Sequence, residues 1–350
     1  METLDLGGTD PRVQRPGERL LSRARRSVDE ALREFTGDLP PGAKLWSGFH
    51  FGWWDERGRP DSARPGKALR PALALGCGES VGGAAPDIVP VGAAVELVHN
   101  FSLIHDDVID GDRTRRDRPT VWSIFGVPAA LLGGDALLVH ACAVLARALP
   151  ERGMPLVRRL CGTVQELIEG QAMDLAFEAR DEVSPEEYTA MALGKTGSLM
   201  GAACALGALA AGSERPRADH LDRFGRALGL AFQITDDLLG LFGDARVTGK
   251  PVGADLARRK KTYPVLAALT AGGPAAAELA ELYARPEPLT GDQVAHGARL
   301  VERAGGRDLA REAARDALEQ AFGHLDAAEP LPGPRRDLAG LALMMTDRSH

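Results

Sequence analysis

From Lys67 to the C-terminus, the chain is a series of apolar, Ala-rich stretches separated by short breaks at Gly or Pro. Convincing runs of alternating apolar and polar residues, which mark half-buried strands, are absent from this sequence. Only 5% of the residues are aromatic, whereas strands favour aromatic and β-branched side chains. The pattern predicts an all-α protein.

A length of 350 residues would by itself suggest about two domains. No Pro- or Ser-rich joint divides the helical stretches, so we expect one large helical bundle over residues 17–350 and a loose tail over residues 1–16. Apolar residues at helical spacing predict a first helix from Leu20 to Phe35. Residues 37–65 are expected to form a structured loop, because Gly and Pro interrupt them repeatedly while Trp53 and Trp54 argue against an exposed linker.

The overall composition excludes several classes of protein. With 44% hydrophobic residues the chain can bury a core, and a net charge of −7 argues against a general nucleic-acid binder. The N-terminus lacks the apolar segment of a secretory signal. The most apolar stretch, Gly126–Leu149, contains Asp135, His140 and Arg147, so we expect no membrane span. Four cysteines without C-x-x-C spacing suit a reducing cytoplasm, which is the predicted location.

Two short acidic clusters end apolar stretches that are far apart in the sequence. Asp106, Asp107 and Asp110 form D-D-x-x-D, and a helix would place Asp106 and Asp110 about 6 Å apart on one face. Taken alone, this pattern also suits a solvated helix end. Carboxylates without Cys or His partners suit Mg²⁺, which would neutralise the like charges. Asp236 and Asp237 end a similar run, so the two helix ends could face one another across a cavity in a bundle.

Two more polar residues share the faces of these acids, and a third acid lies in a different helical stretch. His99 lies two turns before Asp106, Gln233 precedes Asp236 on the same face, and Asp174 follows Gln171 by three residues. A lone aspartate in an apolar helix is more often part of a hydrogen-bonded structure than a metal ligand.

Basic residues gather in several short groups: Lys67 with Arg70, then Arg113, Arg115 and Arg116, then Lys195, then Lys250, and finally Lys260 with Lys261. Each group alone suits a solvated face or an ion pair. Lys195 is different, because it lies beside Thr196 in an apolar stretch where an unpaired lysine would be costly. Together the groups supply enough positive charge for two diphosphates.

In their order along the chain, these segments resemble the trans-isoprenyl diphosphate (polyprenyl) synthases from about Phe51 onward. The motifs are G-K-A-L-R-P, H-N-F-S-L-I-H-D-D-V-I-D, R-R-D-R-P-T, G-D-A-L-L, G-Q-A-M-D-L, G-K-T-G, F-Q-I-T-D-D-L-L-G and G-K-P-V-G-A-D-L with K-K-T-Y-P. F-G-W-W-D and D-D-L-L-G-L-F-G-D are similar to the actinobacterial geranylgeranyl and farnesyl diphosphate synthases. The resemblance implies a helical bundle of the isoprenoid synthase type around a central cavity, in a homodimer.

The resemblance also assigns roles to residues. Three Mg²⁺ ions would be held by Asp106, Asp110, Asp174 and Asp236, supported by Asp107 and Asp237. The allylic diphosphate would be bound by Arg115, Lys195, Lys250 and Lys260, and isopentenyl diphosphate by Lys67, Arg70, His99 and Arg116. Thr196 and Gln233 would stabilise a carbocation or position the groups that do.

The implied reaction is a prenyl transfer. Metal and cationic side chains stabilise the leaving diphosphate while the allylic C–O bond ionises. The double bond of isopentenyl diphosphate attacks the cation, and loss of a proton leaves an allylic product five carbons longer. Phe101 and Ser102, about one turn before Asp106, would set the length of the product. A lone aromatic there implies a C20 product with C15 as the alternative, although Phe101 also suits an ordinary core position.

The sequence departs from the family pattern at three positions. Gly240 replaces the third Asp of the second acidic motif, Asp117 replaces a frequent Gly, and Ala68 replaces a frequent Arg. A class I terpene cyclase would need an N-D-x-x-S-x-x-x-E motif, which is missing around Asp236. A non-catalytic subunit would be expected to lose a charged cluster, and a helical scaffold would leave Lys195 unexplained.

Overall fold

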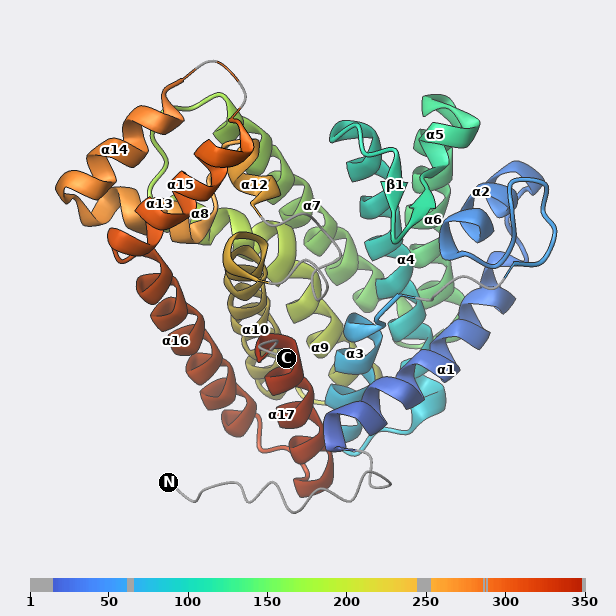
Figure 1. The fold of residues 1–350 in the computed structure, drawn as a ribbon. Coiled ribbons are helices and arrows are strands. Elements are labelled where there is room, and N and C mark those ends of the chain that lie inside the picture. Colours follow the sequence, from blue (N-terminus) through green and yellow to red (C-terminus); the bar gives the residue numbers. More distant parts are fainter. Residues whose placement is uncertain (1–14, 62–65, 244–252, 286, 288, 348–350) are drawn as a thin grey trace.

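The computed structural model describes residues 15–61, 66–243, 253–285, 287 and 289–347, and it confirms the all-α prediction (Figure 1). The first helices are α1 (Pro16–Thr36), α2 (Pro41–Phe51), α3 (Leu69–Ser80), α4 (Ala85–Ile109), α5 (Val121–Phe125), α6 (Val127–Ala148), α7 (Gly153–Glu178) and α8 (Pro185–Ala192). A π-helical turn, η1 (Leu193–Gly197), leads into α9 (Ser198–Ala210) and α10 (Arg215–Phe242). The remaining helices are α12 (Ala254–Ala257), α13 (Tyr263–Ala271), α14 (Gly273–Tyr283), α15 (Gly291–Arg303), α16 (Gly306–Ala327) and α17 (Pro332–Thr346).

Two parts of the described chain differ from the expected pattern. The segment predicted as a structured loop contains α2, whose Pro41 occupies the first helical position, where a proline is tolerated. A short antiparallel hairpin of β1 (Thr114–Arg115) and β2 (Arg118–Pro119) follows α4. Two-residue strands are too short to produce a visible alternation in the sequence.

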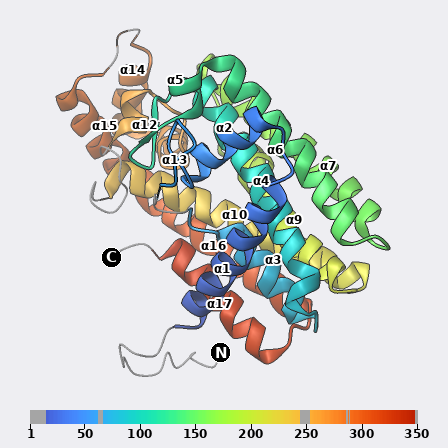
Figure 2. The same ribbon diagram turned by 90° about the vertical axis from the view of Figure 1, so that its right-hand side faces the viewer.

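The first and last described helices, α1 and α17, lie side by side, so the two ends of the described chain are close together (Figure 2). α1 packs on α3, α4 and α17. A Cβ atom on Gly17 would lie 2.5 Å from the backbone carbon of Gly340, so only glycine allows α1 and α17 this approach. The buried positions of α1, which include Leu20, Ala24 and Val28, confirm its predicted apolar face.

The centre of the bundle is formed by helices that are apolar on every side. α9 is buried over its whole length except Leu209, and it packs against α3, α4, α7 and α10. Such helices belong in the interior of a larger protein. Two smaller apolar clusters, one around Leu241 and one around Ile234, attach the C-terminal half of α10 to the last helices. The end of α10 is therefore held from both sides.

By length and composition alone, α4, α6 and the continuous run Pro185–Ala210 are apolar enough to cross a membrane. In the structure, 72% of the most apolar window of α4 and 78% of that of Pro185–Ala210 are buried inside the bundle, against 50% for α6. The interior of the bundle thus accounts for the apolar character of two of the three segments.

Candidate active site

Both acidic clusters lie at the C-terminal ends of helices. Asp106 and Asp107 are in the last turn of α4, and Asp110 is its C-cap. Asp236 and Asp237 lie in the last two turns of α10. The C-terminal end of a helix carries partial negative charge, so carboxylates are unfavourable there. Both clusters therefore need neighbouring positive charge.

Asp106 shares its surroundings with acids and bases from other helices. Burial raises the pKa of its carboxyl, and the charges of Asp110 and Asp174 raise it further, whereas Lys195 and Arg115 lower it. The structure thus brings together residues that the sequence separates by as much as 89 positions.

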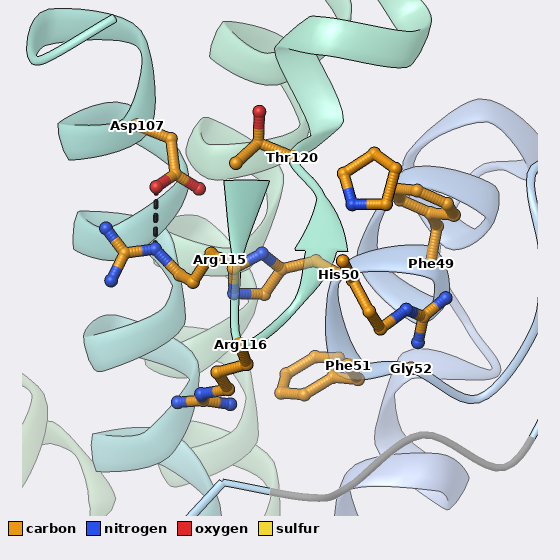
Figure 3. Close-up of a pocket in the computed structure, with 10 residues that line it drawn as sticks. Phe49, His50, Phe51, Gly52, Asp107, Arg115, Arg116 and Thr120 are labelled. Atoms are coloured by element: carbon orange, nitrogen blue, oxygen red, sulfur yellow. Dashed lines mark hydrogen bonds and ion pairs between the residues drawn. The ribbon is translucent and has the colours of Figure 1, made fainter. Parts of the chain in front are cut away.

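Asp107 points toward the hairpin rather than toward its neighbouring acids. Its Oδ1 accepts a hydrogen bond of 2.6 Å from Nε of Arg115, as Figure 3 shows. Its Oδ2 is buried without a hydrogen-bond partner, and burial raises the pKa of the carboxyl to about 6. Asp107 therefore orients Arg115.

Asp174 lies between two lysines. Its Oδ2 accepts hydrogen bonds from Nζ of Lys195 at 2.5 Å and from Nζ of Lys260 at 3.3 Å. These two cations lower the pKa of Asp174 even though burial opposes them. Lys261 instead donates to the carbonyl of Phe177, so Lys260 is the lysine of this pair that faces the acids.

Close contact of small residues positions Lys195. It lies in η1, and π-helical turns are frequent at functional sites. A Cβ on Gly170 of α7 would lie 2.2 Å from the backbone nitrogen of Lys195, and one on Gly229 of α10 would lie 2.7 Å from the Cα of Gly197. Both helices therefore approach η1 at glycine, which brings the lysine within reach of Asp174.

A buried hydrogen-bond network holds the second acidic cluster. The hydroxyl of Thr196 donates to Oε1 of Gln233, and Nε2 of Gln233 donates to Oδ1 of Asp237. Oδ2 of Asp237 accepts from the hydroxyl of Tyr188 at 2.6 Å and from the backbone nitrogen of Tyr263 at 3.0 Å. Burial still raises the pKa of Asp237 to about 6. Sequence reasoning missed Tyr188, since no nearby motif marks it.

The residues expected to bind isopentenyl diphosphate come together at the hairpin and the start of α3. Burial, together with the positive charges of Arg70 and Arg116, holds the pKa of His99 well below its usual range. The guanidinium of Arg116 lies 3.0 Å from the Cβ position of Gly66, beside Lys67. Nε of Arg70 is buried without a hydrogen-bond partner, so this basic group has donors available for an anion.

Two further residues beside these basic side chains, an acid and a histidine, were not predicted from the sequence. Glu96 is buried, and the charges of Arg70 and Arg116 act on it. His50 of α2 hydrogen-bonds Oδ1 of Asn100 at 3.0 Å. Burial and the two arginines of the hairpin, Arg116 and Arg115, lower the pKa of His50 to about 3. His50 also lines a small cavity of about 30 Å³ with Asp107 and the arginines (Figure 3).

The hairpin turn explains one departure from the family pattern. Arg116 and Asp117 are its two central residues, with φ of 52° and 62°. Such turns favour residues that tolerate left-handed backbone, most often Gly, Asn or Asp. Asp117 is therefore compatible with the place where a glycine is frequent. Ala68 also has a positive φ, of 54°, between Lys67 and α3.

Phe101 is buried beside the first acidic cluster. Its ring meets that of His105 edge-on, with the centroids 4.9 Å apart. A Cβ on Gly134 of α6 would lie 2.3 Å from Nε2 of His105, so a glycine is needed for this packing. Ser102 donates its hydroxyl to the carbonyl of His99. The rings of Phe101 and His105 thus form one aromatic block between α4 and α6, and Nε2 of His105 is 3.2 Å from the carbonyl oxygen of Leu131.

Asp255 lies where the second acidic motif has lost its third aspartate. Oδ2 of Asp255 is 3.0 Å from the position that a Cβ on Gly240 would take. The charge of Asp255 acts on Asp237 and Lys260. The local sequence gives no sign of this contact. Lys250 lies outside the described residues.

The donors suit a hard divalent cation that is bound partly by substrate. Among the described residues, no three His, Cys, Asp or Glu side chains are grouped closely enough to hold one metal ion by themselves. Mg²⁺ is typically held by one or two carboxylates together with phosphate oxygens and water. The acids at the ends of α4 and α10 fit that mode of binding, because each offers carboxylate oxygens where positive charge is needed.

A family model described as polyprenyl synthetase matches residues 61–297. The chain belongs to this family. It is 43% identical over 333 residues to the geranylgeranyl diphosphate synthase of Mycobacterium tuberculosis, covering 95% of this chain and 94% of that protein. It is 41% identical over 332 residues to a (2E,6E)-farnesyl diphosphate synthase of Mycobacterium bovis, covering 94% and 92%.

Solved structures of the family have the same fold. The polyprenyl synthetase of Streptomyces coelicolor A3(2) matches with a TM-score of 0.90 and 41% identity, covering 94% of this chain and 99% of that one. A polyprenyl synthase of Caulobacter crescentus CB15, described as complexed with calcium and isoprenyl diphosphate, matches with a TM-score of 0.81 and 26% identity, covering 97% and 100%. The chain is therefore a short-chain trans-isoprenyl diphosphate synthase, a transferase.

Proposed function

We propose that this synthase condenses isopentenyl diphosphate with an allylic diphosphate and releases geranylgeranyl diphosphate (C20), with farnesyl diphosphate (C15) as the alternative. The observation that carries the proposal is the cluster around Lys195, where Asp106, Asp174 and Lys260 meet from distant parts of the chain. A site that contains both acids and bases suits a diphosphate with bound metal ions, because the acids can hold the metal ions while the bases hold the phosphate oxygens.

The allylic diphosphate would lie between the two acidic helix ends. We infer that Asp106, Asp110, Asp174 and Asp236 hold three Mg²⁺ ions, which would neutralise the charge on the departing diphosphate. Lys195 and Lys260 are paired with Asp174 in the structure and can pass to the phosphate oxygens. Arg115, aligned by Asp107, adds a rigid donor, and we assign Lys250 to the same diphosphate.

Isopentenyl diphosphate would bind at the basic group of Lys67, Arg70, His99 and Arg116. The lowered pKa of His99 keeps its imidazole neutral, so it acts there as a hydrogen-bonding group rather than as a charge. The carbonyl of Gln233 lies beside the hydroxyl of Thr196 and could face the developing allylic cation. Exclusion of water would protect this cation from being quenched.

The proposal of a C20 product rests on the block formed by Phe101 and His105. A rigid aromatic pair between α4 and α6 would stop the growing chain, while Ser102 is small. The curated relatives include both a geranylgeranyl and a farnesyl diphosphate synthase at similar identity, so they do not choose between the two lengths.

We further propose that residues 17–350 act as one domain, in the cytoplasm, as a homodimer. A face of α6 and α7 exposes large apolar side chains, namely Leu131, Leu132, Val139, Met154, Ile168 and Leu175. On α7 these side chains belong to a row of exposed positions, three or four residues apart, that also contains Arg158 and Gln165. Exposed apolar side chains gathered on two packed helices suit burial against a second copy of the chain.

The product assay tests the proposed function directly. The purified protein is incubated with isopentenyl diphosphate, Mg²⁺ and a C5, C10 or C15 allylic diphosphate, and the products are separated by chromatography. We expect elongation that stops at C20. A C15 end product would establish the alternative, a hydrocarbon product would indicate a terpene cyclase, and no elongated product would overturn the proposal.

A further inference from the structure

A second and much larger cavity lies away from the acids, where α10, α16 and α17 meet. Its volume is about 580 Å³, within the range of sites that bind small molecules. Its apolar lining includes Leu238, Leu239 and Phe242 of α10 and Leu343 of α17. We call it the α16 groove. Figure 1 shows these three helices packed together.

One wall of the α16 groove is a row of arginines. Arg307, Arg311 and Arg315 follow one another at four-residue intervals on α16, so they line one face over about 12 Å. Arg307 is engaged, because it pairs with Glu302 at 2.6 Å and its guanidinium lies over the ring of Phe242. It forms the boundary between the charged wall and the apolar wall.

The other two arginines are only loosely held. Arg311 lies 3.6 Å from Asp308, and Arg315 lies 3.7 Å from Glu312 and 3.9 Å from Asp316. All of these side chains are more than half exposed, and such ion pairs contribute little. Two adjacent guanidinium groups can therefore exchange these partners for an anion with several oxygens.

The charge of the groove also favours an anion. Among its described lining residues, three arginines face one carboxylate, that of Asp347 at the end of α17. A diphosphate offers two groups that arginine can grip with paired hydrogen bonds. The leucines and Phe242 would cover an apolar tail of the kind that an isoprenoid provides.

We propose that the α16 groove binds a long-chain prenyl diphosphate through its arginines, without a metal ion. The inference rests on the proposed function in one respect, since the protein would itself make an amphiphile of this class. Leu238 and Phe242 lie about 200° and 240° around α10 from Asp236, whereas Leu239 lies about 60° from it, so the groove covers the opposite face of the helix and reaches the edge of the face that carries the acids. An occupant would contact the same last turns of α10 that carry the second acidic cluster.

Titration calorimetry in EDTA distinguishes the α16 groove from the acidic site, because EDTA removes the metal ions on which binding at the acids depends. Geranylgeranyl diphosphate is titrated below its micelle concentration into the full-length protein saturated with isopentenyl diphosphate, which occupies the basic group around Arg70 and cannot react without Mg²⁺. We expect one saturable site per chain. Inorganic diphosphate and the neutral alcohol geranylgeraniol, which each lack one half of the amphiphile, should bind at least tenfold more weakly.

Charge reversal locates this metal-independent site. Arg311→Glu/Arg315→Glu should weaken binding at least tenfold, whereas Arg299→Glu/Arg303→Glu, the same charge change on α15, should leave it unaltered. The proposal is overturned if wild type binds nothing in EDTA, or if both double variants bind equally. Elongation of a short primer with Mg²⁺ checks that each variant is folded. Failure of that assay in wild type would count against the proposed function and not against the groove.

Discussion

The surroundings of individual side chains in the basic group decide whether they carry a charge. Burial of His50 disfavours an imidazolium, and so do the neighbouring charges of Arg116, Arg115 and Arg118. Its pKa of about 3 means that it stays neutral at any ordinary working pH. A neutral His50 can be hydrogen-bonded to Asn100 without adding to the positive charge around the substrate.

The lowered pKa makes stability depend on pH in a definite direction. The unfolded chain binds a proton at His50 below about pH 6.5 while the folded chain does not, so acid favours unfolding. His50 should cost the folded state about 2 kcal/mol between pH 7 and pH 5. Asp107 and Asp237, whose raised pKa values act in the opposite direction, are common to wild type and variant. Urea denaturation should therefore show a change from pH 7 to pH 5 that is about 2 kcal/mol less favourable in wild type than in His50→Gln. His296→Gln, which removes a half-buried histidine of α15 paired with Glu278, should not make this change smaller. An unchanged pH dependence in His50→Gln would contradict the assignment.

Phe101 carries the prediction on product length. Phe101→Ala removes one ring of the block between α4 and α6, so products longer than those of wild type should appear on chromatography. The variant should also lose about 3–5 kcal/mol of stability, as buried aromatic truncations do. Phe224→Ala truncates a fully buried aromatic of α10 and should lose stability without a change of product. An unchanged product distribution in Phe101→Ala would show that this residue does not limit the length of the product.

At the scale of elements, the site depends on how closely helices approach one another. α7, η1 and α10 meet at Gly170, Gly197 and Gly229, where side chains would collide with backbone. This approach brings Lys195 within reach of Asp174, and the Thr196–Gln233 bond joins η1 to α10. Displacement of any one of the three elements would disturb charges contributed by the other two.

Two glycines of α7 test this dependence. Gly170→Ala places a Cβ 2.2 Å from the backbone nitrogen of Lys195, so η1 must shift. We expect activity to fall more than tenfold and stability to fall by about 1–3 kcal/mol, as overpacking does. Gly162→Ala on the same helix meets open space and should be about 0.5–1 kcal/mol more stable with normal activity. Kinetic assays and urea denaturation would detect both effects, and equal activity in the two variants would refute the argument.

For the whole molecule, the exposed apolar side chains of α6 and α7 have consequences for assembly. Wild type should sediment at twice the mass of the 37.1 kDa chain. Val139→Glu/Ile168→Glu, at positions that are 69% and 53% exposed, should sediment as the monomer, since two charges per chain would have to be buried. Leu309→Glu, a 43% exposed position on α16, should leave the mass unchanged. A monomeric wild type would overturn the proposed homodimer.

The sequence by itself determined the helical class and the local chemistry of each motif. Helical spacing is a local property, so α1 and the D-D-x-x-D pair follow from residues three and four positions apart. The same local reasoning missed α2, because Gly and Pro at its start and end hid a helix of eleven residues. It also missed the two-residue strands of the hairpin.

Only the tertiary structure decided which charges meet. Asp174 is held by lysines 21 and 86 positions away, and Tyr188 reaches Asp237 across 49 positions. His50 joins the basic group through Asn100, and Asp255 comes to lie beside Gly240. These partners depend on where helices cross and how closely glycines let them approach. That is a property of the packed bundle, which no spacing along the chain encodes.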